Sequence, residues 1–135
     1  MTTTNYYNTF IEVADDCPIA AAEVPPLKKD TPSVANLQFD MIMANPYKYT
    51  SDEVIFGIYA LRNGIVGNLE AERTAFFAKG QACLRASPLS KRYAWGTHHD
   101  AEGKVALYSS ESVEYQRFMS DSALKHTKAM RSKKG

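Results

Sequence analysis

Residues 92–109 constrain the fold most, because they read as a β-hairpin with a defined register. The runs RYAWGTHH and KVALYS lie on either side of the turn sequence DAEG. Gly103 suits the left-handed position that closes a three-residue turn over Ala101–Gly103. With that turn, position 98 pairs with position 106 and position 100 with position 104, so the sequence predicts an antiparallel pair of strands.

This register sorts the hairpin residues into two sets, because successive side chains of a strand point to opposite faces. The first set is mostly apolar or aromatic and is expected to face the core: Tyr93, Trp95, Thr97, His99, Val105 and Leu107. The second set combines small residues with polar ones: Arg92, Ala94, Gly96, His98, Asp100, Lys104, Ala106 and Tyr108. A four-residue loop would shift the pairing and make the His98 face apolar.

The adjacent histidines do not indicate a metal site. His98 and His99 point to opposite faces while both remain in the strand, so they cannot bind one ion together. Zinc needs further ligands, and the chain offers only His126, the distant Cys17 and Cys83, and carboxylates. We therefore expect neither a metal nor a cofactor.

The second face of the hairpin instead predicts a small anion site. Alanine and glycine form a floor without bulk, and a guanidinium, an imidazole and a phenol can all donate hydrogen bonds to an anion. The rim residues are Arg92, His98, Lys104 and Tyr108, with Arg85 or Lys91 nearby. The alternative is that a helix packs across the small residues and fills this face.

The remaining sequence predicts five helices and two further strands. Capping and stop signals place the helices at 32–44, 50–63, 68–79, 110–119 and 121–130, with N-caps at Thr31, Thr50, Asn68, Ser110 and Asp121. The strands are expected at 8–14 and 82–86. Separate runs of strands and helices are typical of an α+β fold with a small, mainly antiparallel sheet of three to five strands.

Length and composition fit one domain over residues 1–135. A chain of 135 residues can bury a core without disulfides or metal. Residues 1–7 and about 131–135 are expected to be flexible ends. The proline-rich loop 18–32 is longer than most structureless connections, which makes it either functional or mobile.

The sequence predicts a soluble, cytoplasmic protein. Its start has no signal peptide, and its longest apolar stretch, Val54–Leu61, is too short to cross a membrane. Cys17 and Cys83 show no metal or disulfide spacing, so both are expected to be reduced thiols.

The charge of the chain argues against strong nucleic-acid binding but is unevenly distributed. The net charge is +1. Residues 1–67 hold 4 basic and 8 acidic side chains, whereas residues 68–135 hold 12 basic and 7 acidic ones. The basic end KHTKAMRSKKG is interpreted as a solvated tail, and weak RNA association through the C-terminal half is kept as an alternative.

Cys83 provides an enzymatic alternative. It could act as a nucleophile if a histidine, His98 or His99, lay close enough to lower the pKa of its thiol. A buried structural thiol is the competing interpretation. Ser87 lies in ASP rather than in a GxSxG elbow, and the glycines form no nucleotide-binding loop, so no other catalytic motif is present.

Three stretches together resemble a known family: NTFIEVADDCP, NPYKYTSDEVIF and FFAKGQACLRASPLSKRYAWGTHHDAEGKVALY. They are similar to a family of short bacterial proteins whose function is unknown, and the similarity extends from Asn8 to about Met130. The family pattern has glycine at the position of Ala94 and proline at the position of Ala82. The resemblance implies a bacterial, stand-alone, soluble protein and assigns no catalytic residue or cofactor.

The sequence leads to a function hypothesis with two alternatives. We expect a noncatalytic module that binds a small anionic ligand on the 92–108 hairpin or contacts a protein partner, without membrane or nucleic-acid binding. The alternatives are a cysteine-dependent enzyme that uses Cys83 with a histidine, and weak RNA association.

Overall fold

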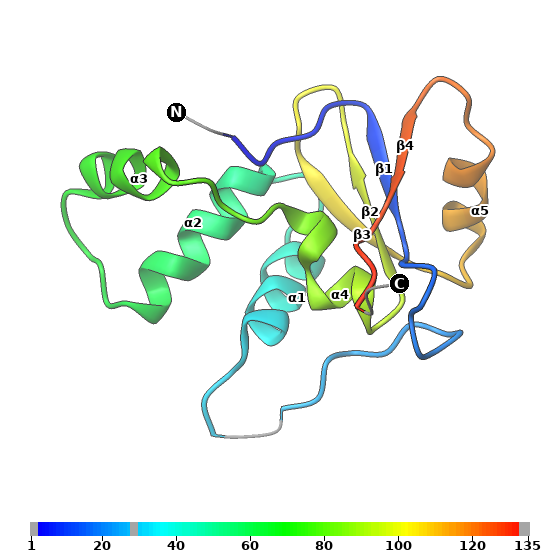
Figure 1. The fold of residues 1–135 in the computed structure, drawn as a ribbon, viewed down its shortest axis with the longest axis horizontal. Helices are drawn as coiled ribbons and strands as arrows, with labels where there is room; N and C mark the ends of the chain where they lie inside the picture. Colours follow the sequence, from blue (N-terminus) through cyan, green and yellow to red (C-terminus); the bar gives the residue numbers. More distant parts are fainter. Residues whose placement is uncertain (1–2, 28–29, 133–135) are drawn as a thin grey trace.

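The computed structural model describes residues 3–27 and 30–132, which form an α+β fold as the sequence predicts (Figure 1). The elements in chain order are β1 (Thr9–Glu12), α1 (Val34–Ala44), α2 (Ser51–Arg62), α3 (Leu69–Ala78), the 3-10 helix η1 (Leu84–Ala86), α4 (Pro88–Lys91), β2 (Trp95–His99), β3 (Val105–Ser109), α5 (Val113–Met119) and β4 (Lys125–Lys128).

The four strands form one mixed sheet in the order β3-β2-β1-β4. β2 is antiparallel to both β3 and β1, and β4 is parallel to β1. The predicted hairpin register is confirmed: His98 pairs with Ala106, and Asp100 N–H donates to the carbonyl of Lys104 at 3.0 Å. Gly103 closes the turn with φ of +81°, as its left-handed position requires.

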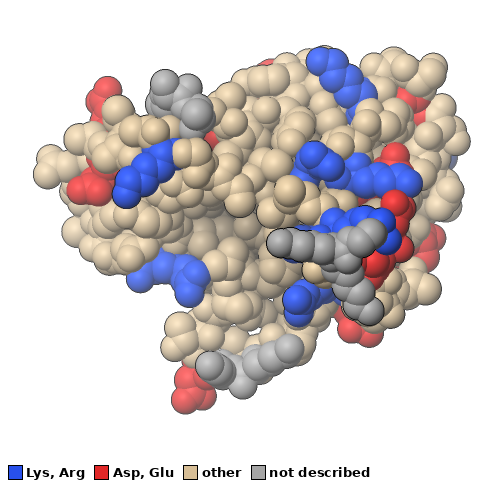
Figure 2. Space-filling model, viewed as in Figure 1, with Lys and Arg blue, Asp and Glu red and all other residues tan. Residues whose placement is uncertain are grey.

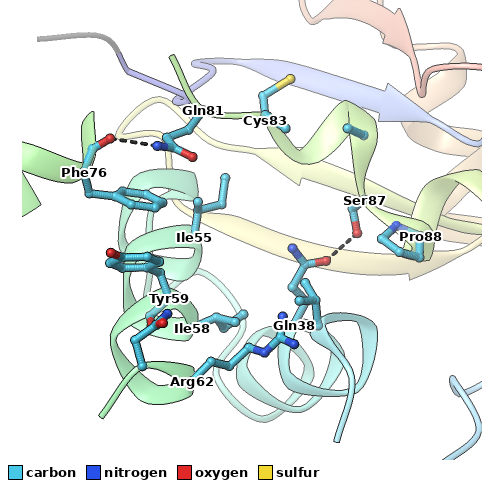
Figure 3. A pocket seen from close by; sticks show the side chains of 14 residues that line it. Gln38, Ile55, Ile58, Tyr59, Arg62, Phe76, Gln81, Cys83, Ser87 and Pro88 are labelled. Atoms are coloured by element: carbon cyan, nitrogen blue, oxygen red, sulfur yellow. Dashed lines mark hydrogen bonds between the residues drawn. The ribbon is translucent and has the colours of Figure 1, made fainter. Parts of the chain in front are cut away.

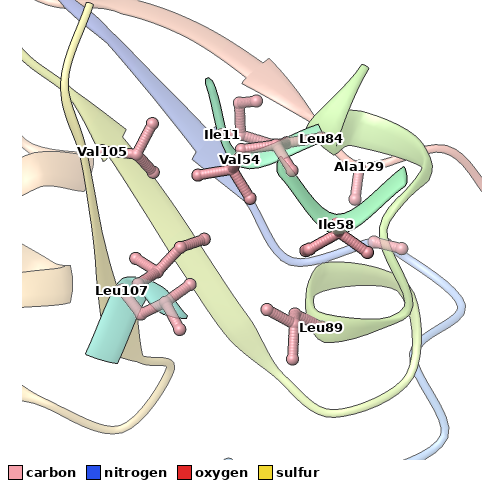
Figure 4. Packing of buried hydrophobic residues seen from close by; sticks show 10 residues of the cluster. Ile11, Val54, Ile58, Leu84, Leu89, Val105, Leu107 and Ala129 are labelled. Atoms are coloured by element: carbon pink, nitrogen blue, oxygen red, sulfur yellow. The ribbon is translucent and has the colours of Figure 1, made fainter. Parts of the chain in front are cut away.

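Helices cover the sheet unequally. In Figure 1 the sheet lies between α5 and the other helices, with α1, α2 and α4 on one face and α3 farthest from the strands. On the face toward α1, α2 and α4, aliphatic residues of the sheet, of these helices and of η1 pack into the main core (Figure 4). They are Ile11, Ile42, Val54, Ile58, Leu84, Leu89, Val105 and Leu107. A second cluster, Phe56, Ala60 and Phe77, joins α3 to α2.

Two predicted elements are wrong. Residues 121–130 do not form a helix: β4 lies there, and Lys125 N–H and Ala129 N–H donate to carbonyls of Asn8 and Glu12, both at 2.8 Å. Residues 82–86 do not form a strand but lead into η1 and then α4, which begins at Pro88 with Ser87 as its N-cap. Long-range pairing and a local proline cap override the expected elements.

Helix starts follow capping chemistry, although not always at the expected residue. The capping box of Thr50 and Glu53 at α2 is confirmed. α1 is capped by Ser33 rather than Thr31, and α5 by Ser112 rather than Ser110. Asn68 precedes α3 in a left-handed conformation without a side-chain capping bond.

The described chain ends contact the fold. Thr4 N–H and Thr4 Oγ1 each donate to Asp52 Oδ1 at 2.7 Å, which ties residues 3–5 to the start of α2. Ser132 N–H donates to Asp16 Oδ2 at 2.9 Å. The predicted flexible ends also include residues 1–2 and 133–135, which lie outside the described residues.

Candidate functional site

The hairpin face, formed by Gly96, His98, Ala106 and Tyr108, is covered by aromatic rings. A Cβ atom at Gly96 would lie 2.6 Å from the ring of Tyr115 and 2.7 Å from the ring of Phe10. The floor predicted for an anion therefore holds the contact between the sheet and α5, and this is the helix packing that the sequence left as the alternative.

Polar atoms of the hairpin face are joined through a residue that the sequence did not suggest. Tyr47 Oη lies 2.8 Å from His98 Nδ1 and 2.7 Å from Tyr108 Oη, and the His98 ring stacks on Phe118 at 4.2 Å. Tyr47 has φ of +60°, a strained value for tyrosine that is held by its N–H bond to Val105 O at 2.9 Å. The structure thus brings His98 and Tyr108 together around the Tyr47 hydroxyl.

The network favours uncharged side chains. Burial lowers the pKa of His98, and the charges of Asp100 and Asp121 oppose this effect. Burial and the hydrogen bond to Tyr108 raise the pKa of Tyr47. Burial thus disfavours the charged forms of both side chains, and their polar atoms bond to one another within the fold.

The other predicted rim residues lie elsewhere. Lys104 pairs with Glu102 at 3.4 Å beside the hairpin turn. Arg85 Nε donates to the carbonyl of Lys128 at 2.7 Å. Arg92 is the C-cap of α4 rather than part of β2. Ala94, with φ of +63°, lies between Arg92 and β2 and interrupts the strand alternation of side chains that would place Arg92 on the hairpin face. A left-handed conformation is unusual for alanine and favours glycine.

Arg92 instead lines a groove between α1, α2 and α4. The groove consists of two adjoining hollows of about 530 Å³ and about 640 Å³. Both are lined by Val34, Arg62, Ala86 and Pro88, which makes them continuous. Volumes of this size are typical of sites for small organic ligands. We call the first hollow, next to α2 and α3, the apolar half and the second, next to α4, the cationic half.

The cationic half is named for its charges. Arg62, Lys91 and Arg92 line it, and no Asp or Glu of the described chain lines either half. Within the described residues these three side chains form no ion pair and no hydrogen bond. Figure 2 shows a hollow in this face of the molecule with Lys and Arg side chains around it. Three unpaired cations around one concavity create a positive potential that attracts anions.

The loop 18–32 forms the outer lip of the cationic half. Pro26, Thr31 and Pro32 line it. The loop is held in place where Trp95 Nε1 donates to Glu23 O at 2.8 Å and Asn36 Nδ2 donates to Pro25 O at 2.9 Å. The described part of the loop is thus an anchored wall of the groove.

Cys83 lies at the wall of the apolar half, and its partner is a tyrosine. Cys83 Sγ lies 3.2 Å from Tyr6 Oη, and the Tyr6 ring packs edge-on against His99 at 5.5 Å. Burial, together with the bond to Cys83, raises the pKa of Tyr6 to about 12. Neither His98 nor His99 contacts the sulfur among the described residues, so the cysteine–histidine pair that the sequence suggested is not assembled here.

Other features of the described chain assign no further chemistry. No group of three or more His, Cys, Asp or Glu side chains there is placed to hold a metal ion. None of its helices combines the length and the apolar character needed to cross a bilayer. In the basic C-terminal stretch, Lys128 pairs with Asp15 at 2.9 Å, while Lys133 and Lys134 lie outside the described residues.

Comparison with known proteins identifies the family. Residues 1–135 match the model of a family of unknown function, DUF6157. The chain belongs to DUF6157. This confirms the resemblance to a family without an assigned activity. No curated protein and no solved structure matches. The function of this DUF6157 member must therefore be argued from its own side chains.

Sequence reasoning missed Arg62 and Gln38, which both line the groove. A basic residue in the last turn of a helix is expected to complement the helix dipole, so Arg62 gave no functional signal. Gln38 gave a signal that could have been used. It occupies the inward stripe of α1, between Val34 and Ile42, where an apolar residue is expected.

Proposed function

We propose that this protein is a noncatalytic ligand-binding module of the bacterial cytoplasm and that the groove binds a small organic anion. The observation that carries the proposal is the set of unpaired cations, Arg62, Lys91 and Arg92, around a concavity without acidic lining residues among those described. Charge-assisted bonds to a carboxylate or phosphate are the interactions that such side chains form most favourably.

The geometry of the groove supports binding rather than catalysis. Its cationic half offers donors and positive charge, but the lining residues described include no histidine or carboxylate that could act as a general base. The compartment is supported by Cys17 and Cys83, both free thiols, which fit a reducing environment. The bacterial source is inferred from the family resemblance.

The test is a thermal-shift panel with phosphates, sugar phosphates, nucleotides and carboxylates. An anion that occupies the groove raises the melting temperature by several degrees when present at about 100 times its dissociation constant. Replacing both Arg62 and Arg92 by alanine is expected to weaken that anion at least about tenfold, because two charge-assisted bonds are lost.

Two matched controls locate the site. Replacing Arg117 on α5 and Lys125 on β4 by alanine removes the same charge away from the groove and should leave binding unchanged. Replacing His98 and Lys104 by alanine removes two rim residues of the hairpin face, the alternative place for an anion. Equal binding by the wild type and the Arg62, Arg92 variant, or loss of binding only in the His98, Lys104 variant, would contradict the proposal.

A further inference from the structure

The apolar half of the groove contains an amide that is buried but incompletely bonded. Gln38 is 7% exposed and lies in the middle of α1. Ser87 Oγ donates to Gln38 Oε1 at 2.5 Å and accepts from Leu89 N–H at 3.1 Å. In this arrangement the amide oxygen of Gln38 points toward α4 and its nitrogen points toward the hollow (Figure 3).

The amide nitrogen of Gln38 has no hydrogen-bond partner within the described residues. This donor lies at the wall of the hollow, where a ligand that carries an acceptor can reach it. A fold without use for this donor could place leucine or methionine at the same position of α1. The orientation of Gln38 therefore indicates that a ligand supplies a hydrogen-bond acceptor here.

An acceptor faces the hollow from its other wall. Gln81 Nε2 donates to the carbonyl of Phe76 at 2.7 Å, which leaves Gln81 Oε1 directed into the hollow (Figure 3). Ile55, Tyr59 and Phe76 form the apolar surface on the α2 and α3 side. The apolar half thus presents one donor and one acceptor beside aromatic and aliphatic side chains.

Arg62 connects this half to the cationic half. It extends from the last turn of α2 toward Gln38 in Figure 3 and lines both hollows. An anionic group bound by Arg62, Lys91 and Arg92 would therefore lie directly next to a ring held in the apolar half.

We infer that the groove binds a planar nitrogen heterocycle that carries both an acceptor and a donor and is joined to a phosphate, which is the chemistry of a nucleoside monophosphate. The ring lies in the apolar half, where its acceptor receives the Gln38 amide and its donor bonds to Gln81. The phosphate lies among the three cations. This inference rests on the proposed function, because it assigns a ligand class to the same groove.

The experiment is an NMR titration of the ¹⁵N-labelled protein with the common nucleoside monophosphates, the corresponding nucleosides, inorganic phosphate and aryl carboxylates. At least one monophosphate is expected to shift signals of both halves of the groove. Its nucleoside and inorganic phosphate should each bind at least about tenfold more weakly, because each makes only part of the contacts.

Two variants test the ring contacts separately from the charge. Gln38→Met and Gln81→Met keep the length of the side chain and remove its amide. Each is expected to weaken the monophosphate about tenfold, the effect of one lost hydrogen bond, and to leave inorganic phosphate unchanged. Gln116→Met, on the exposed side of α5, is the matched control. Gln81 is only half-buried, so its variant remains informative if Gln38→Met fails to fold.

The outcomes separate the two proposals. If the monophosphate binds the two glutamine variants as tightly as the wild type, or if only aryl carboxylates bind, the inference is wrong and anion binding in the groove still stands. If no anion binds in the groove, the proposed function fails and the inference with it.

Discussion

The hairpin face and the groove contain similar polar residues but differ in whether those residues have partners. On the hairpin face, Tyr47 joins His98 and Tyr108 at 2.8 and 2.7 Å under the cover of α5. In the groove, Arg62 and Arg92 have no ion pair among the described residues. A polar group that the fold satisfies supports structure, whereas one that the fold leaves unpaired is available for a ligand.

This difference also separates stability from binding. Residues of the hairpin face are expected to change the free energy of unfolding when replaced, because they are buried and bonded. Residues of the groove are expected to change ligand binding and to leave stability nearly unchanged.

The largest effect is expected for Phe10→Ala. Phe10 is 0% exposed, and its ring packs against Tyr115 at 5.0 Å and Phe118 at 5.1 Å. Loss of a buried phenylalanine costs about 3 to 5 kcal/mol of unfolding free energy, measured by urea denaturation. Tyr7→Ala, at an aromatic residue that is 49% exposed, is the control and should cost much less. A small change in Phe10→Ala would mean that α5 does not close the hairpin face.

The second prediction concerns pH and the core side of the sheet. Burial, with a smaller contribution from the charge of His98, lowers the pKa of His99 to about 4, while Asp100 opposes this shift. As the pH falls below about 6.5, the ordinary pKa of histidine, His99 takes up a proton in the unfolded chain while it stays neutral in the folded protein. Stability is therefore complete above about pH 6.5 and is lost as the pH falls toward about 4, by up to about 3 kcal/mol.

Urea denaturation between pH 7 and pH 4 measures this loss. In His99→Gln, which does not titrate, the slope of stability against pH should be clearly smaller, even if the variant is less stable throughout. An unchanged slope would show that the buried imidazole does not titrate as its environment implies.

The third prediction is Tyr47→Phe, which removes the hydroxyl shared by His98 and Tyr108. Two hydrogen bonds are lost between half-buried groups, so unfolding free energy should fall by about 1 to 2 kcal/mol. Tyr49→Phe is the matched control, because the Tyr49 hydroxyl has no hydrogen bond among the described residues. Equal losses of unfolding free energy in the two variants would show that the network around Tyr47 does not stabilise the fold.

The parts of the fold that the sequence predicts correctly are set by local chemistry. Gly103 defines the hairpin turn, and the Thr50–Glu53 capping box starts α2. The parts that it does not predict depend on distant residues. β4 forms because Lys125 and Ala129 donate to the backbone of β1, more than a hundred residues earlier, and no local pattern in KHTKAM announces that pairing.

The candidate site shows the same contrast between local patterns and contacts of distant residues. The sequence predicts an anion site that includes Arg92, and it is right that His98 and Tyr108 share a face. It assigns Arg92 to that face because strand alternation is extended through Ala94, whose φ of +63° ends the alternation. Arg62 and Arg92 are 30 positions apart, so only the packing of α2 and α4 against α1 shows that they line one groove.

The smallest effect on stability, and the most discriminating one, is expected for Arg62→Ala and Arg92→Ala. Both side chains are exposed and unpaired, so each substitution should change the free energy of unfolding by less than about 0.5 kcal/mol. Each should nevertheless weaken anion binding in the titration, because a charged donor to the ligand is lost. A substantial loss of stability in either variant would show that the arginine supports the fold, and unpaired cations would then no longer distinguish the groove from the hairpin face.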